Sequence, residues 1–302
     1  MTMTLTMRTV AVAIVMMACV DGIGAAPRAA SALDGAKIEQ LTGAKGALDA
    51  REGVFKVSVP RTDLAVTVAG VKMAPALGLT SWAAFRDAGS ETMVMGDMVL
   101  TEEQVTPVMD AALNNGLEVT ALHNHFLHDT PRVMFMHVGG MGDATALATA
   151  IGRVFAAIAA TSAGKATART VAMDPAATTL DPAVIDGVLG VKGTLGSGVY
   201  KIVIGRNASM HGQAIGGAMG VNTWAAFAGS DQQAVVDGDF AMRESELQGV
   251  LKALRAADIE VVAIHNHMAM EDPRMLFLHF WGVGSTRALA GGLHDALAVL
   301  GK

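Results

Sequence analysis

The sequence predicts an α+β protein with an internal duplication: two ferredoxin-like (split βαβ) halves with mainly antiparallel sheets and helices on one face, packed as a pseudo-dimer. Two observations carry this prediction. First, residues 121–140, ALHNHFLHDTPRVMFMHVGG, are repeated 142 positions later as AIHNHMAMEDPRMLFLHFWG, residues 263–282. Second, segments with apolar residues at every second position and segments with apolar residues every three or four positions follow in the same order in both halves.

The first predicted strands are residues 53–61, GVFKVSVPR, and their counterpart 198–206, GVYKIVIGR, in which alternate residues are apolar. A second pair of strands is predicted at residues 93–100 and 234–242. Each of these leads into a helix, and in the second half the helix at 244–256 gathers its apolar residues on one face: Leu247, Val250, Leu251 and Leu254.

The remaining elements also have recognisable boundaries. Thr101 and Gln104 have the spacing of a capping box at the start of the first-half helix. A strand carrying His-Asn-His, a Pro-Arg loop and a strand containing a third histidine come next. A last helix then follows in each half, with Asp143 and Ser285 as the expected N-caps.

Four segments are predicted along the chain: a signal peptide at 1–32, a first α+β repeat at 33–160, a linker at 161–180 and a second repeat at 181–302. The signal is indicated by the uncharged apolar run Val10–Val20, which is too short to span a bilayer. The chain is therefore expected to be exported, to the periplasm or the extracellular space. Cys19, the sole cysteine, is either a lipid anchor or a residue discarded with the signal.

Composition excludes several classes of partner. The formal charge of −6 and a pI near 5.8 argue against nucleic acid, which would need a basic face. No internal stretch of the mature chain has the ~18–20 uninterrupted apolar residues of a membrane span. A mature chain without cysteine forms no disulfide, so packing of its apolar core must stabilise it.

The candidate site is a set of three histidines and a carboxylate in each half. Alternate residues of a strand share a face, so paired strands with His265 opposite His279 would bring three imidazoles together. This chemistry suits a divalent transition metal, with Zn the first choice and Cu, Mn or Fe as alternatives. The predicted ligands are His265, His267, Glu271 and His279 in the second half, expected to be the better formed site, and His123, His125, Asp129 and His137 in the first. A buried histidine network and metal-free acid–base chemistry remain as alternatives.

Arg132 and Arg274 follow the two prolines at the mouth of each predicted site. Either arginine would clamp a small anionic ligand, or form a salt bridge to Asp97 or Asp239 on a neighbouring strand. These aspartates are also candidate partners of the histidines. Glu271, Arg274 and Asp239 are the candidates for catalytic roles, whereas Trp82 and Trp224 are expected in the core.

The strings TWAAF, VVDGDFAM and AIHNHM…EDPRMLFLHFWGVG, with their first-half counterparts, resemble the LppY/LpqO family of bacterial exported lipoproteins. The resemblance covers nearly the whole mature chain. It implies export and a duplicated domain, but it supplies no reaction.

The predicted function is that of an exported metal-binding protein with one site in each repeat. Three readings stay open: a metal-dependent hydrolase or other metalloenzyme, a non-catalytic periplasmic binder of metal or a small anion, and a structural duplicated domain with a buried histidine network.

Overall fold

The computed structural model describes residues 33–162 and 171–301. The predicted signal peptide, with Cys19, lies outside these residues, as does part of the predicted linker. The elements of the first half are α1 (Gly35–Thr42), β1 (Gly46–Asp49), β2 (Val54–Pro60), β3 (Thr67–Val68), β4 (Val71–Lys72), η1 (Pro75–Leu77), β5 (Thr80–Asp87), β6 (Thr92–Thr101), α2 (Glu102–Asn114), β7 (Glu118–His123), β8 (Asp129–Thr130), β9 (Val133–Gly142) and α3 (Ala144–Ser162). Those of the second half are η2 (Pro175–Ala177), α4 (Pro182–Leu189), β10 (Thr194–Gly196), β11 (Val199–Gly205), β12 (Ala208–Met210), β13 (Gln213–Ile215), η3 (Gly217–Met219), β14 (Asn222–Gly229), β15 (Ala234–Arg243), η4 (Glu244–Glu246), α5 (Leu247–Ala256), β16 (Glu260–His265), β17 (Glu271–Asp272), β18 (Met275–Gly284) and α6 (Thr286–Leu297).

One sheet of twelve strands receives six strands from each half, in the order β1-β2-β5-β6-β9-β7-β16-β18-β15-β14-β11-β10. Read inward from each edge, the two sets of six strands are equivalent, so the internal duplication and the mixed α+β class are confirmed. All neighbouring strands of this sheet pair antiparallel. The sequence predicted mainly antiparallel sheets.

The centre of each half is a strand–helix–strand unit with an additional strand inserted. β6 and β7 are joined by α2, and β9 lies between them, antiparallel to both. The full ferredoxin-like order is not confirmed, because the strand on the other side of β6 is β5, which precedes it in the chain. In a ferredoxin-like half, a strand that follows the last helix would occupy that place.

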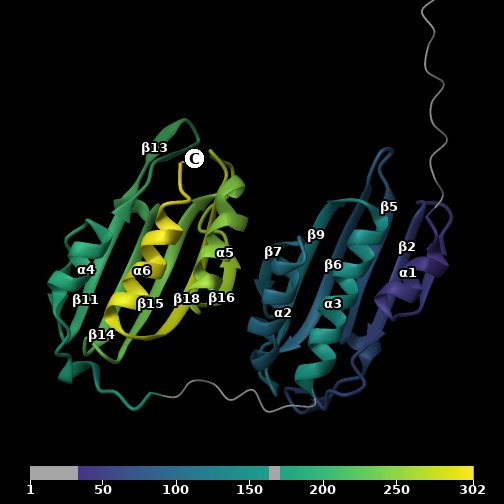
Figure 1. Ribbon diagram of the computed structural model, residues 1–302, viewed down its shortest axis with the longest axis horizontal. Helices are drawn as coiled ribbons and strands as arrows, with labels where there is room; N and C mark the ends of the chain where they lie inside the picture. The colour runs from purple at the N-terminus through teal and green to yellow at the C-terminus, as the bar shows by residue number, and fades with distance from the viewer. Residues whose placement is uncertain (1–32, 163–170, 302) are drawn as a thin grey trace, which may run out of the picture. The chain divides into compact units, whose positions relative to one another are not determined.

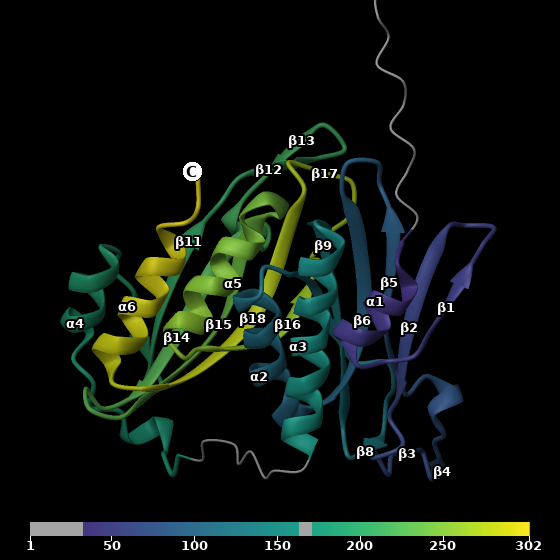
Figure 2. The same ribbon diagram turned by 45° about the vertical axis from the view of Figure 1, so that its right-hand side comes forward.

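The helices lie on one face of the sheet, and the main core fills the space between them (Figures 1 and 2). Val94 and Met98 of β6 point toward this core because alternate residues of a strand face the same side. The apolar face of α2 meets them with residues spaced three and four apart: Val105, Val108, Met109 and Ala112.

The opposite face of the sheet is covered only at one end of each half. Two small three-stranded sheets, β4-β3-β8 and β13-β12-β17, lie there over separate apolar clusters. Phe135 belongs to one cluster and Phe277 to the other. Among the described residues, the rest of this face carries the histidines of both halves together with exposed apolar side chains, such as Met95 of β6 and Trp281 of β18.

The two halves meet where β7 and β16 pair at a single position, Leu122 opposite Ile264. Helix contacts reinforce this short junction, since Arg255 of α5 forms a bidentate ion pair with Asp110 of α2, at 2.8 and 3.1 Å. The predicted pseudo-dimer therefore takes the form of one continuous sheet.

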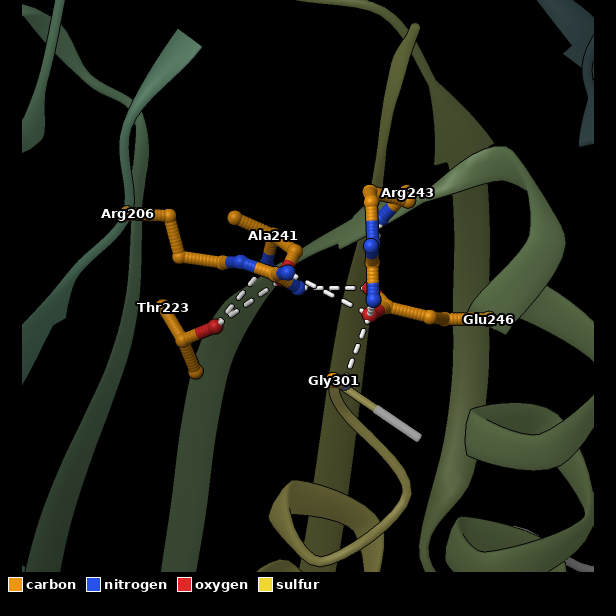
Figure 3. A network of polar contacts seen from close by, with 6 residues as sticks. All are labelled: Arg206, Thr223, Ala241, Arg243, Glu246 and Gly301. Carbon is orange, nitrogen blue, oxygen red and sulfur yellow. Dashed lines mark hydrogen bonds and ion pairs between the residues drawn. The ribbon is translucent and has the colours of Figure 1, made fainter. Parts of the chain in front are cut away.

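The predicted helix starts are confirmed in both halves. Asp143 accepts a hydrogen bond from the Ala146 N–H, and Ser285 caps α6 through the Ala288 N–H. Thr101 and Gln104 form the capping box of α2. The position of Gln104 is taken in the second half by Glu246, whose carboxylate binds Arg206, Arg243 and the Gly301 N–H (Figure 3).

Helix α3 packs closely against α1, and this contact leads to a first prediction. A Cβ added at Gly152 of α3 would collide with the backbone oxygen of Leu41, which cannot move without shifting α1. We expect Gly152→Ala to lower the free energy of unfolding by about 2–3 kcal/mol, measured by urea denaturation. Gly187→Ala in α4 is the matched control. A Cβ added at Gly187 would have no other atom within 4 Å, so this change should raise the free energy of unfolding by about 0.5–1 kcal/mol. Equal effects of the two changes would contradict the close approach.

Residues 144–161 of α3 are also the one described segment that is long and apolar enough, by length and composition alone, to cross a membrane. Here α3 buries Ile151 and Val154 in the main core, so its apolar character is explained by packing on the sheet.

Candidate metal centre

Three neighbouring strands place the second-half site on the open face of the sheet. Asp239 lies in the middle of β15, directly opposite His279 of β18. His265 ends β16, the next strand on the other side of β18, and His267 follows it after one residue. The site is therefore built from the centre of the sheet and from the first residues of the loop after β16.

The pairing of β16 with β18 differs from the predicted register. Ala263 lies opposite His279, and His265 lies opposite Phe277, with an irregularity between Val261 and Ala263. The predicted partner of His279 was His265. The two registers differ by two residues, which returns every side chain to the same face, so the histidines still converge.

The distances identify a compact group of three potential ligands. The Asp239 carboxylate lies 3.0 Å from His267 Nε2 through Oδ2 and 3.5 Å from His265 Nε2 through Oδ1. Among the described residues, these three form a group whose ligand atoms all lie within 4.8 Å of one another. His279 lies outside that group of three but adjoins it, with its ring stacked on that of His265 at a centroid distance of 4.5 Å.

The backbone fixes which nitrogen of each ring faces the site. His267 Nδ1 lies 3.2 Å from the Gly220 carbonyl, and His279 Nδ1 lies 3.4 Å from the Gly238 carbonyl. A carbonyl only accepts hydrogen bonds, so each Nδ1 has a partner for a proton and each Nε2 faces the site. His267 Nε2 there meets the Asp239 carboxylate at 3.0 Å, another acceptor, and a metal ion bound by both atoms would take the place of a proton between them. Phe277 supports this orientation because it stacks on the His267 ring at 3.6 Å.

Burial favours the neutral form of His265. Removal from water lowers the pKa of His265 below its usual value, against the attraction of Asp239 and with the repulsion of His279 and His267. Among the residues that the structure describes, Asp239 Oδ1 and His265 Nε2 are buried atoms without a hydrogen-bond partner. With the proton of a neutral His265 on Nδ1, its Nε2 lone pair faces the buried Asp239 acceptor, and a cation between the two atoms would satisfy both.

The first half repeats the arrangement with Asp97, His123, His125 and His137. Asp97 lies opposite His137, and its buried Oδ1 also has no partner within the described part of the chain. His123 Nε2 and His137 Nε2 lie only 3.0 Å apart. The Asn124 carbonyl lies 3.3 Å from His123 Nδ1, which directs the Nε2 lone pair toward His137. Burial lowers the pKa of His125, whose ring stacks on Phe135 at 3.4 Å.

Each of the carboxylates predicted as ligands has one oxygen held by its own loop, while Glu271 Oε2 is a buried atom without a hydrogen-bond partner among the described residues. Glu271 Oε1 accepts from the Met275 N–H at 3.0 Å and pairs with Arg274 at 3.3 Å. In the first half, Asp129 accepts from the Val133 N–H at 2.8 Å. Neither residue belongs to the group of three ligands found in the described chain, where Asp239 supplies the carboxylate.

The arginines do not form the predicted alternative salt bridges to Asp97 and Asp239. Arg274 instead contacts Glu271 and Asn266, and Arg132 lies 3.9 Å from Glu102. The importance of Asp239 was visible in the sequence: aspartate is unfavourable inside a strand, yet both halves place Gly-Asp at the centre of one.

A small hollow of about 250 Å³ adjoins the second-half site. His267 and Trp224 line it together with Lys201, whose ammonium lies 4.1 Å from the centre of the Trp224 ring. Trp224 thus borders open space, although the sequence predicted a core residue. The same stacking recurs in the first half between Lys56 and Trp82, at 4.0 Å.

Comparison with known proteins identifies the repeated unit. The model of a family described as "Domain of Unknown Function (DUF1259)" matches residues 36–157 and again residues 183–299. No curated protein matches the chain significantly. Among solved structures, a trimeric bacterial microcompartment shell protein, PduB, is 11% identical over 84% of this chain and 89% of its own, with a TM-score of 0.19. Such a low TM-score supports no conclusion about fold or function.

Proposed function

The chain belongs to the DUF1259 family in both of its halves, and from this premise we propose that it is an exported metal-binding protein. Asp239, His265 and His267 would hold a divalent transition metal in the second half, with His279 as a further ligand. Asp97, His123, His125 and His137 would form the corresponding site in the first half.

The observation that carries this proposal is the set of unpartnered buried atoms on the open face. Asp239 Oδ1 and His265 Nε2 are buried, face each other at 3.5 Å and have no hydrogen-bond partner among the described residues. A purely structural network would be expected to satisfy such atoms, because each unsatisfied buried group costs about 1–3 kcal/mol. A metal ion supplies the missing interaction to both.

The chemistry of the donors narrows the choice of metal. Imidazole nitrogens with one carboxylate suit Zn first, and also accept Cu, Mn or Fe, whereas Mg and Ca favour ligand sets made of oxygen. The backbone carbonyls on Nδ1 of His267 and His279 are typical of metal sites, where they fix the ring orientation and raise its basicity.

The hollow beside the site supports access for a further ligand. His267 lines it, and the Lys201 ammonium places a positive charge at its edge. We propose that this space admits a small anion and that Arg274 and Arg132, which lie on the Pro-Arg loops, attract such ligands toward the sites. When bound, a metal ion with an open position would lower the pKa of a water molecule and polarise an anionic substrate, as in a metal-dependent hydrolase.

Export is part of the proposal. The N-terminal apolar run Val10–Val20 and the resemblance to the LppY/LpqO lipoproteins support it, with Cys19 as the residue that would carry a lipid. Amino-terminal sequencing of the protein from its native host tests this. We expect a start after residue 25 or 32, or an acylated Cys19, and an intact Met1 in the cytosol would contradict export.

Metal content tests the site itself. We expect the full chain, loaded with zinc and dialysed, to retain about one zinc ion in each half. His267→Ala should remove the ion of the second half, and His123→Ala should remove the ion of the first. His294→Ala is the matched control, since His294 is an exposed residue of α6 that contacts Asp295. Loaded wild-type protein that emerges metal-free would contradict the proposal.

A further inference from the structure

A larger cavity, of about 640 Å³, lies at the junction of the two halves. One wall is the edge of β16, where Glu260, Val261 and Val262 run past the point at which β16 leaves β7. Phe126 from the loop after β7 and Thr106 of α2 also line the cavity. Neither the metal site nor the small hollow described above involves these residues.

The equivalent place on the other side of the junction is filled by a side chain of the protein. Gln248 of α5 reaches the edge of β7 and pairs with the backbone of Val119. Its Oε1 accepts from the Val119 N–H at 3.1 Å, and its Nε2 donates to the Val119 carbonyl at 2.9 Å. A primary carboxamide thus occupies both hydrogen-bonding groups of one edge residue.

The duplication identifies which residues replace this pair at the open cavity. Val261 is the counterpart of Val119, and Thr106 is the counterpart of Gln248. Val119 lies opposite Val138 and Val261 opposite Phe280, before the same strand irregularity, so Val261 turns its N–H and carbonyl outward in the same way. The Thr106 side chain is too short to reach these two backbone groups and carries no carboxamide.

We propose that this cavity binds a small ligand with a primary carboxamide attached to an apolar body. The carboxamide oxygen would accept from the Val261 N–H and its NH₂ would donate to the Val261 carbonyl, as Gln248 does at Val119. Val261 is only 3% exposed, so its backbone groups gain little from water, and a ligand that pairs with both is strongly favoured.

The lining determines which ligands fit. Phe126, Leu127, Val262 and Met134 offer apolar surface to the body of the ligand. The charged residues of the lining are mainly acidic, since Glu102, Asp129 and Glu260 outnumber Arg132. A carboxylate is therefore repelled, and it also lacks the N–H that the Val261 carbonyl requires. A neutral amide meets both conditions.

Benzamide is the probe that tests this inference, followed through the backbone amide signals of the full chain by NMR. We expect benzamide to shift the Val261 amide signal in a saturable way and to leave Val119 unaffected. Benzoate and N,N-dimethylbenzamide should bind at least tenfold more weakly. Neither has an N–H group to donate to the Val261 carbonyl.

Two substitutions at Thr106 complete the test. Thr106→Gln recreates the Gln248 arrangement and should fill the site from within, which would weaken benzamide binding at least tenfold. Thr106→Val, of nearly the same size but without a carboxamide, is the size control and should not reproduce this tenfold loss. Gln248→Thr should open the second site, so that benzamide now also shifts Val119. No benzamide-dependent shift at Val261, or equal binding of the dimethylated amide, would overturn the proposal.

Discussion

Chelation is expected to lower the thermal stability of the zinc-loaded protein substantially. A ligand that binds only the native state stabilises it by RT ln(1 + [L]/Kd), which is roughly 4 kcal/mol at a thousandfold excess over Kd. For a chain of this size, that corresponds to a fall in Tm on the order of 10 °C. Scanning calorimetry before and after EDTA treatment measures the effect, with zinc re-addition to establish that it is reversible.

The same measurement on His267→Ala separates a metal site from a hydrogen-bond network. His267 is partly open to water, with its side chain 30% exposed, so the apoprotein should tolerate its loss. The variant should lose most of the response to chelator while its metal-free Tm stays close to that of the wild type. His294→Ala should behave as the wild type in both states.

A structural network would give the reverse pattern. Truncating His267 would leave the Asp239 carboxylate without its 3.0 Å partner and lower stability by about 1–3 kcal/mol, and chelator would have no effect on any variant. That result would replace the metal proposal by a structural role for the histidines.

The sequence was sufficient to predict the candidate site in part because β-strand alternation is a strict geometric rule. His265 and His279 lie on paired strands and face the same side in either register, and His267, two residues after the end of β16, keeps that side. Glu271 stays a predicted ligand, whereas the sequence placed Asp239 only among the candidate partners of the histidines and the candidates for catalytic roles. Glu271 is close in sequence, but the Met275 N–H and Arg274 hold its Oε1, whereas Asp239 comes from a strand that lies next to β18 only in the folded sheet.

The fold shows the same division between local and long-range information. Helix caps such as Asp143 and Ser285 depend on neighbouring residues, and the sequence predicted them correctly. The joining of the two halves through Leu122 and Ile264 depends on contacts between distant segments. No periodicity in either half specifies that contact, which is why the sequence predicted a pseudo-dimer without the continuous sheet.

Glu246→Gln is expected to destabilise the second half by about 2–3 kcal/mol. Glu246 is 4% exposed and forms ion pairs with Arg206 and Arg243 at 2.6 Å (Figure 3). Burial acts to raise its pKa, but hydrogen bonds from Arg206, Arg243 and the Gly301 N–H outweigh burial and lower the pKa to about 2. In the first half this position is Gln104, whose Oε1 accepts from Arg61 at 3.1 Å, and Asp63 supplies the carboxylate for Arg61 at 2.8 Å.

The lowered pKa fixes the pH range of the effect. A carboxylate whose pKa falls on folding stabilises the native state fully above its unfolded pKa, near 4.5, and this contribution is lost as pH falls toward about 2. A difference of about 2.5 pKa units corresponds to roughly 3 kcal/mol at neutral pH. The wild type should therefore lose its advantage over Glu246→Gln progressively between pH 4.5 and about 2.

Urea denaturation of both proteins at pH 7 and pH 3 checks this expectation. Glu244→Gln is the matched control, because Glu244 is an exposed glutamate at the start of the same helical segment. Its removal should change stability by less than about 0.5 kcal/mol at either pH. If the Glu246→Gln variant is as stable as the wild type at pH 7, Arg206 and Arg243 do not need the charge of this carboxylate. A deficit that persists undiminished at pH 3 would place its origin in packing around Glu246, and the ionised carboxylate would then have no part in it.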